Sequence, residues 1–144
     1  MYIAEQIKRL RSELPDGVNL LAISKYQPIE SLQEAYDAGQ RMFGENHIQE
    51  MAAKAAALPK DIAWHFTGHV QTNKIKYMAS FVSLIHAVDS FRLLREINKH
   101  AAKHNRVIDC LLQIHIAQED TKYGLTVQEC RELLAHEPWR ELEN

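Results

Sequence analysis

Lys25 stands at the end of an apolar stretch, and its type and position suggest chemistry more directly than any other residue. Residues 20–28 read LLAISKYQP, which predicts a short buried strand ending on the lysine and then a turn marked by Pro28. Period-two alternation places Lys25 on the same face as Leu21 and Ile23. A desolvated lysine favours its neutral amine, which can form a Schiff base with an aldehyde. Considered alone, a lysine at a strand end is more often a solvated terminus.

Two further stretches carry polar side chains near predicted strand ends. His65 and His69 are four residues apart, which would suggest a metal pair on a helix, but the first lies in a predicted strand and the second beyond a glycine. A structural or ligand-facing histidine is therefore favoured, and we expect no metal site. Asn46 lies between a strand and a helix, where it could either cap the helix or point into a pocket. The residues alone do not decide between these two roles.

The elements that must position these side chains alternate along the chain. Apolar periodicity predicts an amphipathic helix over residues 3–14 and then five strand–helix units. The capping-box spacing of Ser31 with Glu34, and of Thr126 with Glu129, marks two helix starts. The predicted strands cover residues 18–24, 41–43, 62–67, 81–86 and 107–116, of which the last is the longest. Such alternation is typical of a parallel α/β sheet, either open and doubly wound or part of a β/α barrel.

The placement of the candidate residues favours the barrel. No glycine-rich phosphate loop follows the first predicted strand, as it would in a Rossmann domain. Lys25, Asn46, His65 and His86 fall at or near the carboxyl ends of the first four strands, where β/α barrels carry their functional groups. A complete barrel has eight strands and about 250 residues. Five units leave two unpaired edges, so the sheet is open, the chain is part of something larger, or another chain covers the edges.

Composition and charge exclude several classes of protein. The 144 residues include 17 basic and 19 acidic ones, a formal net charge of -2, which argues against a nucleic-acid partner. No apolar run reaches membrane-spanning length, and the amino terminus lacks a signal-peptide core. Cys110 and Cys130 have no zinc or redox spacing, so we expect reduced thiols in a cytoplasmic protein without a membrane partner.

Several stretches together resemble one family, in order and in spacing. The segments are residues 22–25 (AISK), 43–50 (FGENHIQE), 64–74 (WHFTGHVQTNK), 85–90 (IHAVDS), 113–117 (QIHIA) and 122–124 (KYG). They resemble the pyridoxal 5′-phosphate (PLP) homeostasis proteins, whose barrel is similar to the amino-terminal domain of alanine racemase. The likeness covers essentially the whole chain.

This resemblance implies a PLP-binding role for the chain. It implies a β/α (TIM) barrel of PLP fold type III, of which residues 1–144 would be a single domain with about the first five units. It implies that Lys25 holds PLP as a Schiff base and that Asn46 and His65 line the cofactor pocket. It also implies intracellular storage or delivery of PLP, with PLP-dependent apoenzymes as recipients, rather than enzymatic catalysis. The alternatives are a racemase-like PLP enzyme and a truncated chain that binds no cofactor.

The carboxyl end departs from the family pattern. The family's later strands supply the phosphate cradle and an arginine facing the pyridine nitrogen, and these strands have no counterpart in the 144 residues. Much of the charge-assisted anchoring would then be absent. We therefore expect the chain alone to bind PLP weakly or not at all. We also expect a fragment or truncated product that needs a second copy, or a complementary piece, over its open edges.

Overall fold

A computed structural model describes residues 2–118 and 123–144, and Lys122 of the last matching segment lies outside this part of the chain. The predicted alternation of strands and helices is confirmed. In chain order the elements are α1 (Tyr2–Glu13), β1 (Ala22–Ile23), α2 (Ile29–Asp37), β2 (Met42–Glu45), α3 (Ile48–Ala57), β3 (Ala63–Phe66), the 3-10 helix η1 (Thr72–Tyr77), β4 (Val82–Val88), α4 (Phe91–Lys103), β5 (Asp109–Leu112), α5 (Val127–Ala135) and the 3-10 helix η2 (Glu137–Glu141).

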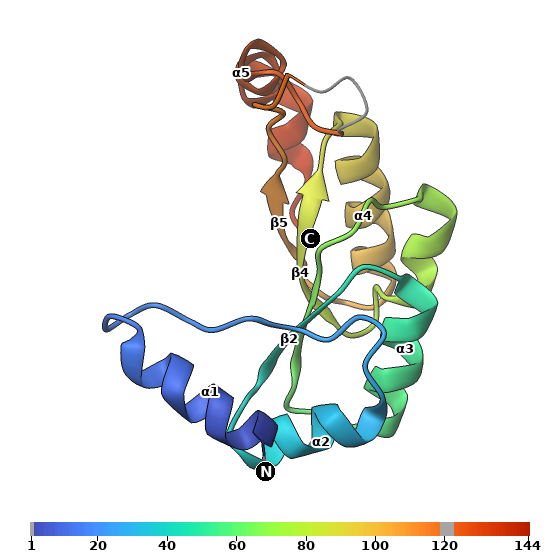
Figure 1. Cartoon of the computed structure of the whole chain (residues 1–144). Helices are drawn as coiled ribbons and strands as arrows, with labels where there is room; N and C mark the ends of the chain where they lie inside the picture. Colours follow the sequence, from blue (N-terminus) through green and yellow to red (C-terminus); the bar gives the residue numbers. More distant parts are fainter. Residues whose placement is uncertain (1, 119–122) are drawn as a thin grey trace.

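The five strands form one sheet in the order β1-β2-β3-β4-β5, and every neighbouring pair is parallel. Strands that follow the chain order belong to a barrel segment rather than to a doubly wound sheet, which changes direction at a switch point. Helices α2, α3 and α4 follow one side of the curved sheet (Figure 1). The fold is therefore α/β with the topology of a partial TIM barrel, as predicted.

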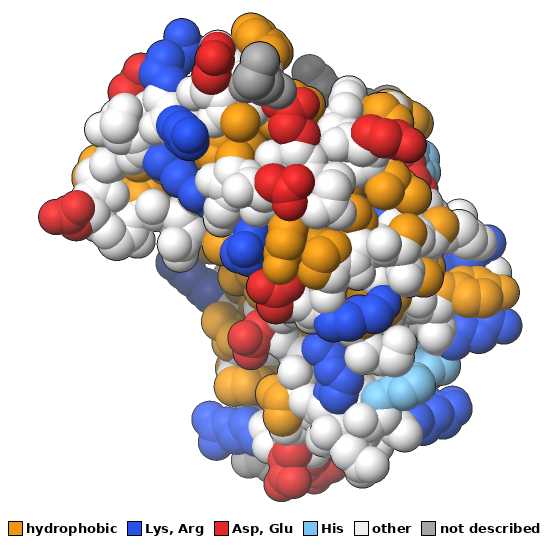
Figure 2. Space-filling model, turned by 90° about the horizontal axis from the view of Figure 1, so that it is seen from below, with side chains coloured by type: hydrophobic (Ala, Val, Ile, Leu, Met, Phe, Trp, Pro, Cys, Tyr) orange, Lys and Arg blue, Asp and Glu red, His pale blue; other side chains and the backbone are white. Residues whose placement is uncertain are grey.

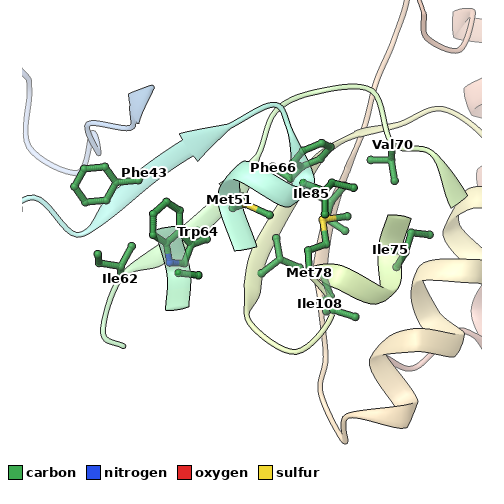
Figure 3. Packing of buried hydrophobic residues seen from close by; sticks show 14 of the residues in the cluster. Phe43, Met51, Ile62, Trp64, Phe66, Val70, Ile75, Met78, Ile85 and Ile108 are labelled. Atoms are coloured by element: carbon green, nitrogen blue, oxygen red, sulfur yellow. The ribbon is translucent and has the colours of Figure 1, made fainter. Parts of the chain in front are cut away.

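The main core lies between the sheet and these helices. Phe43, Trp64 and Phe66 are buried on the face that α3 covers, and Met51 of α3 lies among them (Figure 3). The rings of Phe43 and Trp64 are 5.8 Å apart between centroids, close enough for a tilted aromatic contact. Burial of this face fixes the register of the strands, since a slip by one residue would turn these rings away from α3.

The opposite side of the sheet is called the inner face here. A register row across it contains Ile23, Gly44, His65 and Leu84. A Cβ on Gly44 would lie 2.6 Å from Ile23 Cδ1, so these two residues share one face. At the two ends of the sheet the inner face is open: Ile23 is 52% exposed and Leu111 of β5 is 48% exposed.

Three predicted strands are longer than those observed. The third differs least, since it was expected over residues 62–67 and is observed over Ala63–Phe66. The first was expected over residues 18–24 but is paired only at Ala22 and Ile23, although Ser24 N–H still donates to Gly44 O at 2.9 Å. The lysine was expected in a buried strand, yet the strand is half-exposed at Ile23 because β1 is an edge strand. The fifth was expected over 107–116 and as the longest. It ends at Leu112, and the seven-residue β4 is longer.

The beginnings of the helices agree with the prediction only in part. Ser90 caps α4 through Leu93 N–H at 3.1 Å, and Thr126 with Glu129 forms the predicted capping box of α5. The capping box predicted at Ser31 and Glu34 is wrong. Helix α2 begins earlier, at Ile29, with Pro28 in the cap position, so Ser31 already lies inside the first turn and cannot be the cap.

The surface shows no concentration of one charge on the face seen in Figure 2, where basic and acidic side chains alternate. Among the helices of residues 2–118 and 123–144, none combines the length and the apolar character that a membrane span requires.

Candidate functional site

Lys25 lies in the turn that follows β1, and its residue is exposed rather than buried. The turn closes with a hydrogen bond from Gln27 N–H to Ser24 O at 3.1 Å. Tyr26, the next residue, has a φ of 61°, in the left-handed region that side chains other than glycine rarely adopt. The amine is therefore accessible to a ligand, while the backbone that carries it has an unusual conformation.

A buried ion pair lies directly beneath this turn. Lys54 of α3 donates to Glu45 Oε1 at 2.6 Å, to Glu50 Oε1 at 2.8 Å and to the backbone oxygen of Ser24 at 2.7 Å. An ammonium has three N–H donors, so these contacts use all of them. Ser24 Oγ also donates to Glu45 Oε1 at 2.8 Å. The Lys54 and Glu45 side chains are 6% and 0% exposed, so the pair is buried.

Glu50 extends this cluster to the other side of Lys25. Its Oε1 accepts the backbone N–H of Tyr26 at 2.8 Å. The hydrogen bond from Lys54 is the largest influence on Glu50 and holds the pKa of its carboxyl below the ordinary value, with the Tyr26 N–H adding to the effect. A second contact joins the turn to α3, because Tyr26 Oη and His47 Nε2 share a hydrogen bond of 2.9 Å.

Asn46 follows β2 and does not cap α3. The cap position of α3 is His47, and no side chain makes a capping bond there. Asn46 Oδ1 is buried without a hydrogen-bond partner. Gly68 lies against this residue so closely that a Cβ would be 2.5 Å from Asn46 O. Of the two roles that the sequence left open, capping is therefore excluded, and the buried side-chain oxygen accepts no hydrogen bond from the described residues.

His65 and His86 form a pair on adjacent strands. Nδ1 of His65 and Nε2 of His86 are 2.9 Å apart, so one ring donates to the other. Burial lowers the pKa of His65, and the charge of His86 lowers it further; burial also lowers the pKa of His86. Both effects favour neutral imidazoles on the inner face.

His69 does not join His65 in a metal pair. Its ring stacks on Tyr123 with centroids 3.8 Å apart, whereas His65 contacts His86. Across residues 2–118 and 123–144, no three His, Cys, Asp or Glu side chains gather as metal ligands would. The strands bring Lys25, Asn46 and His65 to the same end of the sheet, but among the described residues no direct hydrogen bond joins these three.

Comparison with known proteins places the chain in a family. The profile of the alanine racemase N-terminal domain matches residues 2–137. The chain belongs to this family. Curated members with similar sequences are named pyridoxal phosphate homeostasis proteins. The one from Aquifex aeolicus is 38% identical over 138 residues, covering 93% of this chain and 60% of that protein. The one from Escherichia coli K12 is 35% identical over 125 residues, covering 84% of this chain and 53% of that protein.

Solved structures agree with the family assignment. PipY of Synechococcus elongatus without PLP has a TM-score of 0.91 and 37% identity. The matched region covers 98% of this chain and 66% of the PipY chain. Its PLP-bound form gives a TM-score of 0.88 at the same identity. Alanine racemase of Clostridium difficile, at 11% identity and a TM-score of 0.74, shares the fold. The chain thus spans a little over half of the curated relatives quoted and 66% of PipY.

Sequence reasoning missed the buried cluster beneath Lys25 in this member of the alanine racemase N-terminal domain family. Glu50 and Lys54 are four apart on a helix, a spacing usually typical of a solvated surface pair. A signal was nevertheless present in Glu45, a carboxylate inside a strand next to the buried Phe43 and Gly44. A buried carboxylate needs a cationic partner, and Lys54 is that partner.

Proposed function

We propose that this chain is the PLP-binding part of a PLP homeostasis protein and that Lys25 is the residue that holds PLP covalently. PLP supplies an aldehyde, with which a lysine amine condenses with loss of water. The single observation that carries the proposal is the accessible Lys25 amine in the turn after β1, in a chain that superposes on PLP-bound PipY with a TM-score of 0.88 at 37% identity.

The residues around Lys25 fit such a ligand. The unpartnered Asn46 Oδ1 can accept a hydrogen bond from a polar ligand. The neutral His65–His86 pair offers a ring nitrogen and adds no positive charge to the inner face. In this proposal Asn46 and His65 line the pocket and orient PLP, while Lys25 provides the covalent attachment.

We propose a carrier rather than an enzyme. The curated relatives quoted above are named for PLP homeostasis. A carrier needs only to bind the aldehyde and shield it from other amines, whereas a racemase needs a second acid–base group across the cofactor. Its recipients would be PLP-dependent apoenzymes in the cytoplasm, in keeping with the free thiols of Cys110 and Cys130. Racemisation of alanine by the purified chain with PLP would contradict the carrier proposal.

The edges of the sheet require a partner in the same proposal. Within the described residues β1 pairs only with β2, and β5 only with β4. A groove of about 270 Å³ runs beside β1, with apolar residues such as Ile3, Ile7 and Leu32 in its wall. We propose that residues 1–144 are the amino-terminal part of one barrel domain and that a second copy, or a complementary piece, covers these edges. That partner would also supply anchoring charge for the phosphate of PLP.

The test is covalent trapping on the purified chain. PLP is added at saturating concentration, the adduct is reduced with borohydride, and the modified peptides are mapped by mass spectrometry. Binding of PLP to the chain alone is expected to be weak, but at this concentration Lys25 should carry the main adduct. The Lys25→Ala chain should lose that adduct, and the matched Lys60→Ala chain should retain it. Scattered labelling of surface lysines, unchanged in Lys25→Ala, would refute the proposal. Sizing with and without PLP tests the covering partner.

A further inference from the structure

The two peptide groups on either side of Lys25 are both held by residues of α3. On the amino-terminal side, Lys54 Nζ donates to the oxygen of the Ser24–Lys25 peptide at 2.7 Å. On the carboxyl-terminal side, Glu50 Oε1 accepts the N–H of the Lys25–Tyr26 peptide at 2.8 Å. Because these two peptide planes set φ and ψ of Lys25, they also set the direction in which its side chain leaves the backbone.

The two holding residues are themselves joined and anchored. Lys54 and Glu50 form an ion pair at 2.8 Å, and Lys54 is tied to the fully buried Glu45 of β2 at 2.6 Å. Lys54 is thus connected to β2, an interior strand of the sheet, while the turn it holds follows the edge strand β1. The turn also needs support, since Tyr26 has a φ of 61° that its own side chain disfavours.

We infer that Lys54 and Glu50 are positioning residues for Lys25: they fix the turn so that the amine is presented in one orientation to the carbonyl of PLP. This inference rests on the proposed function for its ligand, but the tether itself can be tested without one. A lysine that is held in place forms a covalent bond to a carbonyl with less loss of conformational freedom than a mobile one. The cluster therefore gives Lys25 an advantage over the other lysines of the surface.

Hydrogen exchange and trapping test the two parts separately. Glu50→Ala removes the acceptor of Tyr26 N–H but leaves the buried Lys54–Glu45 pair intact, so the chain keeps its core. We expect exchange in the peptide covering residues 24–27 to accelerate about tenfold or more, with β4 unchanged. In the trapping experiment we expect the share of adduct on Lys25 to fall severalfold toward that of a surface lysine. Glu50→Gln keeps an oxygen at this position and should restore most of both.

Lys54→Met and Lys60→Met complete the experiment. Lys54→Met should loosen residues 24–27 as Glu50→Ala does, whereas Lys60, which donates to Ala55 O at 2.8 Å at the end of α3, does not touch the turn. Lys60→Met should leave both readouts unchanged. Wild-type exchange at residues 24–27 in Glu50→Ala would overturn the inference. A wild-type chain without an adduct on Lys25 would instead overturn the proposed function, and the exchange data would still decide whether α3 holds the turn.

Discussion

The imidazoles of His65 and His86 share a single hydrogen bond of 2.9 Å, and this limits the protons that the pair can hold. Once one ring carries two protons, it can still donate to the other. If both rings were charged, neither nitrogen in the contact could accept, and the charges would repel each other. Burial already disfavours the first charge on both rings. The pair is therefore neutral in the folded chain at pH values where an exposed histidine begins to protonate.

This arrangement predicts a loss of stability in mild acid. The pKa of His65 in the folded chain lies below its ordinary value of 6.5, so the unfolded chain binds protons first as the pH falls. The free energy of unfolding should accordingly decrease as the pH drops below about 6.5. Urea denaturation between pH 7.5 and 5.5, run at about half-unit steps, measures this slope.

Two variants separate the contribution of the His65–His86 pair to this pH dependence from that of other histidines. His86→Leu removes the charge that lowers the pKa of His65, so NMR titration should give His65 a higher pKa than in the wild type. It should stay below 6.5, because burial is the larger cause. His104→Leu, at the exposed carboxyl end of α4, is the control and should leave the slope with pH unchanged. A slope that persists in full in His86→Leu would count against the pair.

The candidate site was predictable from the sequence where a residue's position in a strand determines its place. His65 and Asn46 were assigned to strand ends from the alternation of elements, and the structure puts both there. The residues alone favoured a solvated Lys25, and its exposure agrees with that. The turn that carries it was not predictable, because β1 stops at Ile23 and the turn depends on contacts with α3. Those contacts join residues between 21 and 30 positions apart, a separation over which periodicity carries no information.

At the scale of elements, short-range chemistry set the helix starts. The capping box at Thr126 was predictable because both its partners lie within four residues of each other. The same spacing at Ser31 failed because Pro28 starts the helix earlier, and Glu34 instead accepts the N–H of Ala4 from α1 at 3.3 Å. The Glu34 side chain, which the capping box would need, is therefore engaged in a tertiary contact with α1 instead.

The cap of α4 gives a prediction at this scale. Ser90→Ala removes the acceptor for Leu93 N–H, which lies 3.1 Å from Ser90 Oγ at the start of a 13-residue helix. The free energy of unfolding should fall by about 1 kcal/mol, the usual contribution of a serine cap. Urea denaturation at neutral pH measures the change. Ser80→Ala, at an exposed serine outside the helix, should have almost no effect, and an equal loss in both variants would contradict the assignment.

For the whole molecule, the order of the strands was predictable, but whether further strands pair with the two edges of the sheet was not. Alternating strands and helices with right-handed crossovers leave few topologies, and the observed order is the simplest of them. No pattern in a strand says whether a further strand will pair with it. Within the described residues, the edge strands β1 and β5 lack a neighbouring strand on one side, and their Ile23 and Leu111 are about half-exposed, which has a free-energy cost in water.

This cost predicts association through the sheet edges. Leu111→Lys places a charge on the edge strand β5, where it would have to be buried by a strand added to the sheet. Sedimentation velocity over a concentration series should reveal self-association of the wild type that this variant weakens about tenfold or more. Leu10→Lys makes the same change on helix α1, at a leucine that is 40% exposed and does not belong to an edge strand, and should associate like the wild type. If the wild type stays monomeric throughout, a second copy does not cover the edges. That result would contradict the second-copy form of the proposal and leave a complementary piece over β1 and β5 as the form still to be tested.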